Sequence, residues 1–167
     1  MERDTHKAAL EGEGVDMKHF IPALAAMTVL AACATGPRLS DSERLSLYRD
    51  HAGEPVKSFR YTHSLMGWTP LGDSALAVQT RPSQAYLLDL GGPCPNLEFA
   101  QAITITNQFG SVQSRFDDVV PLASGSMRIP CRIREIRPVD VKSLDAAKDR
   151  MRDQIEMVER GQAEGGT

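Results

Sequence analysis

The chain of 167 residues is poor in aromatic residues and has neither a dominant charge sign nor a long apolar run. Tyr, Phe and Trp together make up 5% of the residues, and 19 basic residues are offset by 22 acidic ones. A nucleic-acid-binding domain usually has a basic surface with interleaved aromatics, so that class is not expected. No apolar run reaches the roughly 18–20 residues that a membrane-spanning helix needs. With 41% hydrophobic and 25% charged residues, the composition fits one ordinary globular domain.

The sequence also lacks the short motifs that mark common catalytic sites. It has no Gly-x-Ser-x-Gly elbow, no His-Glu-x-x-His pair, no phosphate-cradling glycine loop and no dinucleotide fingerprint. His51 and His63 are the only imidazoles after residue 33, and both are interpreted as surface residues, whereas Asp89 is interpreted as a solvent-face or turn-bonding residue. Asp117 and Asp118 are adjacent, so on a strand they would face opposite sides and could not form a carboxylate pair by themselves. We therefore expect no enzyme, no cofactor and no metal site.

An export signal is the clearest local feature. Residues 17–19 give a short positive start, and the apolar stretch over residues 20–32 has the length of a signal-peptide core and is too short to span a membrane. The residues Leu-Ala-Ala-Cys at 30–33 are similar to the bacterial lipobox, Leu-(Ala/Ser)-(Gly/Ala)-Cys. This resemblance implies diacylglycerol transfer to the Cys33 sulfur, cleavage before Cys33 and acylation of the new amino terminus. The alternative is a core helix, but residues 20–32 lack the polar face that such a helix needs.

Two flanking features extend this interpretation. Residues 1–16 contain five acidic and two basic residues, which is the wrong charge for the start of a signal peptide. We therefore interpret Met17 as the initiator and residues 1–16 as a start-site extension. Ala34 stands where an Asp usually retains proteobacterial lipoproteins at the inner membrane, so the resemblance implies outer-membrane sorting, with the domain in the periplasm.

The cysteine count predicts a disulfide. Lipidation of Cys33 would leave Cys94 and Cys131, and an even remainder in an oxidising compartment favours one bond between them. Closing a loop of about 38 residues would stabilise the fold by about 4 kcal/mol in the chain-entropy model. Two unpaired buried thiols are the alternative. A zinc site is not expected, because two cysteines so far apart do not match zinc-ligand spacing.

The rest of the chain predicts an α+β domain, mainly antiparallel, with a small curved sheet or a barrel-like arrangement of about six strands. A short helix follows the tether at residues 33–42, with Ser40 or Asp41 as its cap. The connections between the strands are too short for crossover helices, so we expect sequentially connected antiparallel neighbours. Strands are expected near residues 57–61, 68–73, 74–90 as a hairpin with its turn at 81–84, 103–106, 114–122 and 128–137.

A longer helix is expected at residues 139–160, where apolar residues recur at spacings of three and four. The predicted organisation is a start-site extension, a signal peptide, a lipidated tether, one disulfide-stapled domain, and a C-terminal helix with a frayed tail. These segments cover residues 1–16, 17–32, 33–42, 43–142 and 143–167.

Several sequence blocks resemble a known family. They cover residues 68–78, 85–90, 92–94, 115–117, 130–133 and 136–140 and include the hairpin and both remaining cysteines. Together they resemble a family of proteobacterial putative lipoproteins built on a domain of unknown function, over roughly Leu39 to Lys142. The resemblance implies export and supports the pairing of Cys94 with Cys131. It implies no catalytic residues, because no activity is established for the family.

One candidate binding surface lies on the last predicted strand. Arg128, Arg132 and Arg134 are four and two positions apart, and because both separations are even, on a strand the three residues share one face. Arginine can hold carboxylate or phosphate with bidentate geometry, so these residues are a candidate patch for an anion or a lipid headgroup. The alternative, which we favour at this level, is a solvated strand face paired to nearby acids.

Three classes of function fit these features. We favour a non-enzymatic envelope lipoprotein, held to the membrane by its anchor, that binds an envelope protein partner or supports envelope structure. The second class is a small-ligand or anion-binding periplasmic module with a cavity of about 300 Å³ or more lined by Trp68, Leu76, Tyr86 and Phe116. An enzyme is the third and least favoured class. The sequence does not indicate an oligomeric state.

Overall fold

The computed structural model describes residues 39–62, 64–125 and 127–164. The predicted leader, Cys33 and His63 therefore lie outside the described residues. Within the described part, the α+β, mainly antiparallel fold class is confirmed, with a short helix early and a longer one at the C-terminal end. The elements there are α2 (Asp41–Asp50), β1 (Ser58–Arg60), β2 (Gly67–Pro70), β3 (Ala75–Arg81), β4 (Gln84–Leu90), β5 (Ala102–Ile105), β6 (Ser111–Gln113), β7 (Asp118–Leu122), β8 (Cys131–Val139) and α3 (Val141–Glu164).

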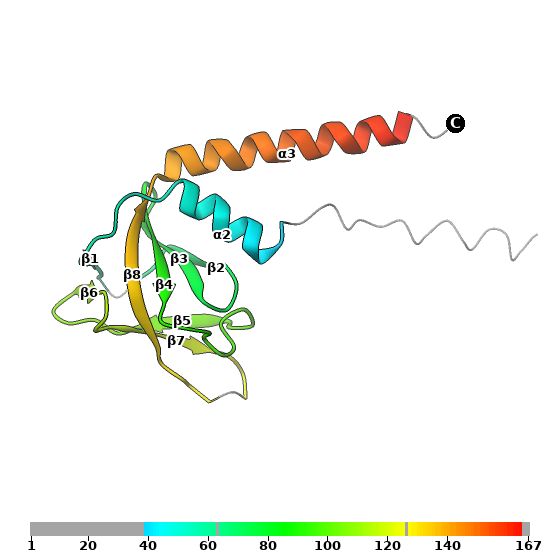
Figure 1. Ribbon diagram of the computed structural model, residues 1–167. Coiled ribbons are helices and arrows are strands. Elements are labelled where there is room, and N and C mark those ends of the chain that lie inside the picture. The colour runs from blue at the N-terminus through cyan, green and yellow to red at the C-terminus, as the bar shows by residue number, and fades with distance from the viewer. Residues whose placement is uncertain (1–38, 63, 126, 165–167) are drawn as a thin grey trace, which may run out of the picture. The chain divides into compact units, whose positions relative to one another are not determined.

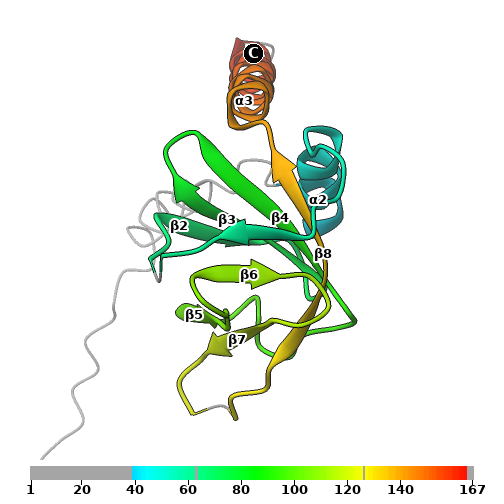
Figure 2. The same ribbon diagram turned by 90° about the vertical axis from the view of Figure 1, so that its left-hand side faces the viewer.

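Six of these strands form one antiparallel sheet in the order β2-β3-β4-β8-β7-β5 (Figures 1 and 2). The sheet is not closed, and β2 and β5 are its edges. The other two strands, β1 and β6, pair with each other as a separate antiparallel ribbon.

The expectation of sequentially connected neighbours is wrong at the centre of the sheet. The last strand, β8, lies between β4 and β7, while β5 pairs with β7. A central strand must bury side chains along its length, and β8 carries buried residues at Cys131, Ile133, Ile136 and Val139. Because β8 extends to Val139, α3 begins at Val141, two residues later than predicted.

The predicted hairpin at residues 74–90 is confirmed as β3 and β4. Its register pairs Leu76 with Leu88 and Val78 with Tyr86. A two-residue loop, Pro82 and Ser83, connects the strands.

Both faces of this hairpin are buried, because successive strand residues point to opposite sides. One face packs in a large core that holds Phe59, Tyr61, Leu76, Val78, Leu88, Leu90, Cys94, Leu97, Ile105, Val112, Val119, Cys131, Ile133 and Ile136. The other face packs in a smaller core under the helices that holds Tyr48, Leu71, Ala75, Ala77, Ala85, Leu87, Val139 and Leu144. The alanines on the second face leave room for the helices to approach the sheet closely.

The short helix α2 is capped and attached to the sheet by specific polar contacts. Glu43 donates its backbone N–H to Ser40 Oγ at 3.3 Å, and Ser40 donates its own N–H to Glu43 Oε2 at 2.8 Å, which forms a capping box. The Arg49 guanidinium donates to Asp89 Oδ1 on β4 at 2.7 Å. Asp89 is therefore a buried residue with a cationic partner, which corrects the prediction of a solvent-face or turn-bonding residue.

The longer helix α3 packs on the sheet only through its first turns. Leu144 and Ala147 are buried, and the Lys148 ammonium lies 5.0 Å from the centre of the Tyr48 ring. Figure 1 shows the second half of α3 extending past the sheet, in agreement with the exposure of Met157 and Val158.

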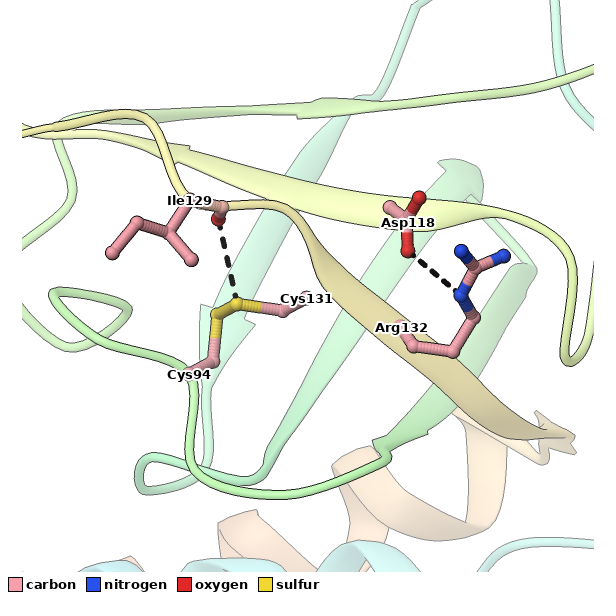
Figure 3. The surroundings of a disulfide bond; sticks show 5 residues. All are labelled: Cys94, Asp118, Ile129, Cys131 and Arg132. Carbon is pink, nitrogen blue, oxygen red and sulfur yellow. Dashed lines mark hydrogen bonds and ion pairs between the residues drawn. A yellow bond between two sulfur atoms is a disulfide. The ribbon is translucent and has the colours of Figure 1, made fainter.

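A disulfide joins Cys94, in the loop after β4, to Cys131 at the start of β8 (Figure 3). The two residues are 37 positions apart and their Cα atoms are separated by 5.6 Å. Both are buried in the large core. The bond closes a loop that contains β5, β6 and β7, and it joins the two ends of this loop, after β4 and at the start of β8.

Candidate functional site

The structure separates the three arginines of the predicted patch. Arg128 lies exposed in the loop before β8, because the strand begins only at Cys131. Arg132 and Arg134 both lie exposed on β8, two positions apart and therefore on one face. The pattern of even spacing thus applies to two of the three residues.

Arg132 is already engaged in holding the fold. Its Nε forms an ion pair with Asp118 Oδ1 (Figure 3), in which the two atoms are 3.0 Å apart, and its Nη1 donates to the backbone carbonyl of Phe116. These contacts connect β8 to the start of β7 and to the turn before it. The alternative reading, a strand arginine paired to a nearby acid, describes Arg132 well.

Arg134 lines an open cleft of about 410 Å³ formed by three segments of the chain. The segments are residues 55–57 before β1, residues 113–116 at the end of β6 and in the turn that follows it, and residues 134–135 of β8. Neither of the first two segments is close to β8 in sequence.

Backbone hydrogen bonds hold the three segments together. Val56 donates to the Ile136 carbonyl at 2.8 Å, Ser114 donates to the Lys57 carbonyl at 3.0 Å, and Arg115 donates to the Ile133 carbonyl at 2.6 Å. The walls of the cleft are therefore fixed by main-chain contacts rather than by long side chains.

The cleft is cationic. Lys57, Arg115 and Arg134 line it, one from each segment, together with a single acid, Glu135. Glu135 Oε1 accepts a hydrogen bond from Arg137 Nε at 2.5 Å, so its charge is compensated by a residue outside the lining. The cleft that Lys57, Arg115 and Arg134 line is called the basic cleft below.

Sequence reasoning found only Arg134 of these three residues. Lys57 and Arg115 are brought to β8 by pairings between segments that are far apart in the chain, and no local periodicity reports such pairings. The one available signal was that residues 115–117 belonged to a block of the family resemblance.

The turn that carries Arg115 is rigidly built around Asp117. The Asp117 side chain is buried and accepts hydrogen bonds from the Gln113 N–H at 2.7 Å and from Thr106 Oγ1 at 3.0 Å. Arg115 has a φ of 70°, in the left-handed region that is unfavourable for residues other than glycine. Such a conformation persists only where the surroundings fix it, as the Arg115–Ile133 and Arg132–Phe116 contacts do here.

A second polar cluster joins the end of α2 to the start of α3. His51 Nδ1 and Ser143 Oγ lie 3.0 Å apart, and Asp140 Oδ1 accepts from the Ser143 N–H at 3.1 Å. That hydrogen bond is the main cause of a lowered pKa at Asp140, with a smaller contribution from the charge of His51. Because Asp140 and Ser143 use their oxygens on the first turn of α3, this Ser–His–Asp grouping is a helix cap that links the two helices.

The four side chains proposed to line a ligand cavity do not surround one space. Leu76 is fully buried in the large core, and Tyr86 stacks on Phe59 with ring centroids 4.4 Å apart. Trp68 is partly buried against the same core, whereas 69% of Phe116 is exposed beside the basic cleft.

Among residues 39–62, 64–125 and 127–164, no three His, Cys, Asp or Glu side chains are grouped so that they could hold a metal ion. Within the same residues, neither helix combines the length and the apolar character needed to cross a membrane.

The fold and the site define an α+β domain with an open antiparallel sheet, two flanking helices, one disulfide and a basic cleft. The chain belongs to the Family of unknown function DUF6491, whose model matches residues 16–154. Neither the curated proteins nor the solved structures gave a match.

Proposed function

We propose that this protein is an exported, lipid-anchored component of the bacterial cell envelope, with a non-catalytic role in binding or in envelope structure. The observation that carries the proposal is the leader, in which a positive start and an apolar stretch lead to Leu-Ala-Ala-Cys at residues 30–33. The match to the family begins at residue 16, so this segment belongs to the matched region.

The disulfide supports the exported location. Bonds between cysteines persist in oxidising compartments and are rare in the cytosol. The described domain joins Cys94 to Cys131, which leaves Cys33 as the one cysteine available for lipid.

The tether would keep the domain close to the bilayer. Cys33 and the first residue of α2, Asp41, are eight positions apart, and an extended chain spans at most about 3.5 Å per residue. The start of α2 would therefore lie within about 28 Å of the lipid anchor. With Ala34 after the lipidated cysteine, we place the domain at the outer membrane, facing the periplasm, where an envelope protein is its expected partner.

Metabolic labelling with an alkyne fatty acid, followed by membrane fractionation, tests the proposal. The wild-type protein should carry the label and sediment with membranes, and Cys33→Ser should do neither. A Cys94→Ala/Cys131→Ala double variant is the matched control, because it removes thiols elsewhere and should keep the label. Equal labelling and fractionation of the wild type and Cys33→Ser would refute the anchor.

A further inference from the structure

The basic cleft has the size and the lining of a small-ligand site. Its volume of about 410 Å³ falls within the range of about 300–1,000 Å³ that is usual for such sites. Three cationic side chains line it from three different segments, and the ring of Phe116 lies at the same cleft. It is a feature of the folded domain, so the inference below stands whether or not Cys33 carries lipid.

The charges in the cleft are available to a ligand. Seven basic side chains form ion pairs within the described residues, and Lys57, Arg115 and Arg134 are not among them. All three are exposed, while the acid of the cleft, Glu135, pairs with Arg137. The lining therefore presents three cations and one acid that already has a partner.

The scaffold that holds these cations is ordered by internal contacts. Arg115 has a left-handed backbone conformation. Its turn is held by the hydrogen bond from the Gln113 N–H to buried Asp117 and by the hydrogen bond from Arg132 of β8 to the Phe116 carbonyl. The Lys57 carbonyl accepts from both the backbone N–H and the hydroxyl of Ser114, which ties its segment to the same turn. The backbone segments that carry the three cations are already held by these contacts, which limits the entropic cost of ordering them on binding.

We propose that the basic cleft formed by Lys57, Arg115 and Arg134 binds a phosphate-bearing ligand. A phosphate group is tetrahedral and can accept hydrogen bonds from donors that approach from several sides, whereas a single carboxylate offers two oxygens in one plane. Two guanidinium groups can each contact phosphate oxygens in a bidentate manner, and the lysine adds a point charge. The apolar ring of Phe116 can contact the non-phosphate part of the ligand.

The phosphate could come from a soluble phosphoester or from a phospholipid headgroup, and the test separates them. The full chain, purified in a neutral detergent at low salt, is titrated calorimetrically with inorganic pyrophosphate and with citrate. A short-chain phosphatidylglycerol in the same detergent is the lipid probe, and short-chain phosphatidylcholine is its neutral counterpart.

Arg134→Gln and Lys57→Gln are the informative variants, since neither side chain has an ion-pair partner within the described residues. Each should weaken binding of the phosphate probe by about tenfold or more, the effect of losing a hydrogen bond to a charged group. Arg128→Gln is the matched control, because it removes the same charge from an exposed arginine outside the cleft and should leave binding unchanged. Thermal unfolding of each variant checks that the fold is retained.

Each outcome decides the proposal. Cleft-dependent binding of pyrophosphate but not of phosphatidylglycerol assigns a soluble phosphoester, and binding of phosphatidylglycerol that pyrophosphate displaces assigns a headgroup. Citrate binding that is tighter than phosphate binding and depends on the cleft would overturn the assignment to phosphate. Failure of both phosphate probes to bind, or equal loss of affinity in Arg128→Gln and Arg134→Gln, would overturn the site itself.

Discussion

Asp117 shows how one buried carboxylate can organise a turn. With 3% of its surface exposed, it accepts hydrogen bonds from the Gln113 backbone and the Thr106 hydroxyl, which come from β6 and from the chain just after β5. Its neighbour Asp118 lies on β7 and pairs with Arg132 instead. The two adjacent carboxylates thus have separate structural roles, in line with the expectation that they form no acid pair.

Replacing Asp117 with Ala should lower the free energy of unfolding by about 1–3 kcal/mol for each donor left unsatisfied in the interior. Asp117→Asn should cost less, because its amide oxygen can still accept one of the two hydrogen bonds. Urea unfolding of the two variants measures the difference. An Asp117→Ala protein within about 0.5 kcal/mol of the wild type, as for an ordinary surface substitution, would contradict this role.

The lowered pKa of Asp140 predicts that the stability contributed by the start of α3 depends on pH. The Ser143 N–H donates to its carboxylate and lowers the pKa below the ordinary value of 3.8. A carboxyl group with a lowered folded-state pKa stabilises the fold fully above its unfolded pKa, and this stabilisation is lost as the pH falls through the folded value. Acid unfolding of the wild type should therefore include a contribution below pH 3.8 that Asp140→Asn lacks. A carboxyl titration by NMR that places the Asp140 pKa at or above 3.8 would refute the cap.

At the scale of elements, the sequence predicted structure that depends on neighbouring residues but not the pairing of strands that are far apart in the chain. The β3–β4 hairpin could be predicted because its alternation and its proline-containing turn lie within residues 74–90. The sequence did not reveal that β8 pairs with β4, since their residues are more than 40 positions apart and no short-range signal selects a partner. The burial of Ala75 and Ala77 could not be predicted either, because alanines on the second face of a strand do little to distinguish a buried face from an exposed one.

The α3 helix should be stable in its first half and weakly protected in its second. Leu144 packs in the smaller core with Tyr48 of α2 and residues of the sheet, and Ala147 is also buried, whereas an unpacked helical segment of about 12 residues is marginal in water. Hydrogen exchange should show protected amides at residues 144–150 and faster exchange at residues 155–164.

Removing residues 153–167 should therefore change the free energy of unfolding by less than about 0.5 kcal/mol. Leu144→Ala is the contrasting variant and should cost about 2–5 kcal/mol, as for other buried leucines. If the truncation costs as much as Leu144→Ala, the second half of α3 has a packing role that the exposed side chains do not indicate.

At the scale of the whole molecule, the Cys94–Cys131 bond ties β5, β6 and β7 to the centre of the sheet. The Cys94→Ala/Cys131→Ala variant should lose about 4 kcal/mol of stability, because the unfolded chain regains the entropy of a loop of about 38 residues. Reduction with dithiothreitol should lower the stability of the wild type by a similar amount and leave the double variant unchanged. Identical unfolding curves for the oxidised wild type and the variant would contradict the bond's contribution.

The candidate site, like the sheet, depends on contacts between distant segments that the sequence does not reveal. Even spacing correctly placed Arg132 and Arg134 on one face, but the strand starts too late to include Arg128. Arg132 forms an ion pair with Asp118 of β7, and no pattern in the sequence predicts this contact. Lys57 and Arg115 joined Arg134 only through the pairing of three distant segments, so the basic cleft could be found only in three dimensions.

The central claim is that the protein is anchored in the envelope through lipid on Cys33, and mass spectrometry of its N-terminal tryptic peptide tests it most directly. Protein isolated from bacterial membranes should yield a peptide of residues 33–38 that begins at Cys33 and carries diacylglycerol and a third acyl chain. An unmodified peptide of residues 19–38, in which the leader is still joined to Cys33, would contradict the account.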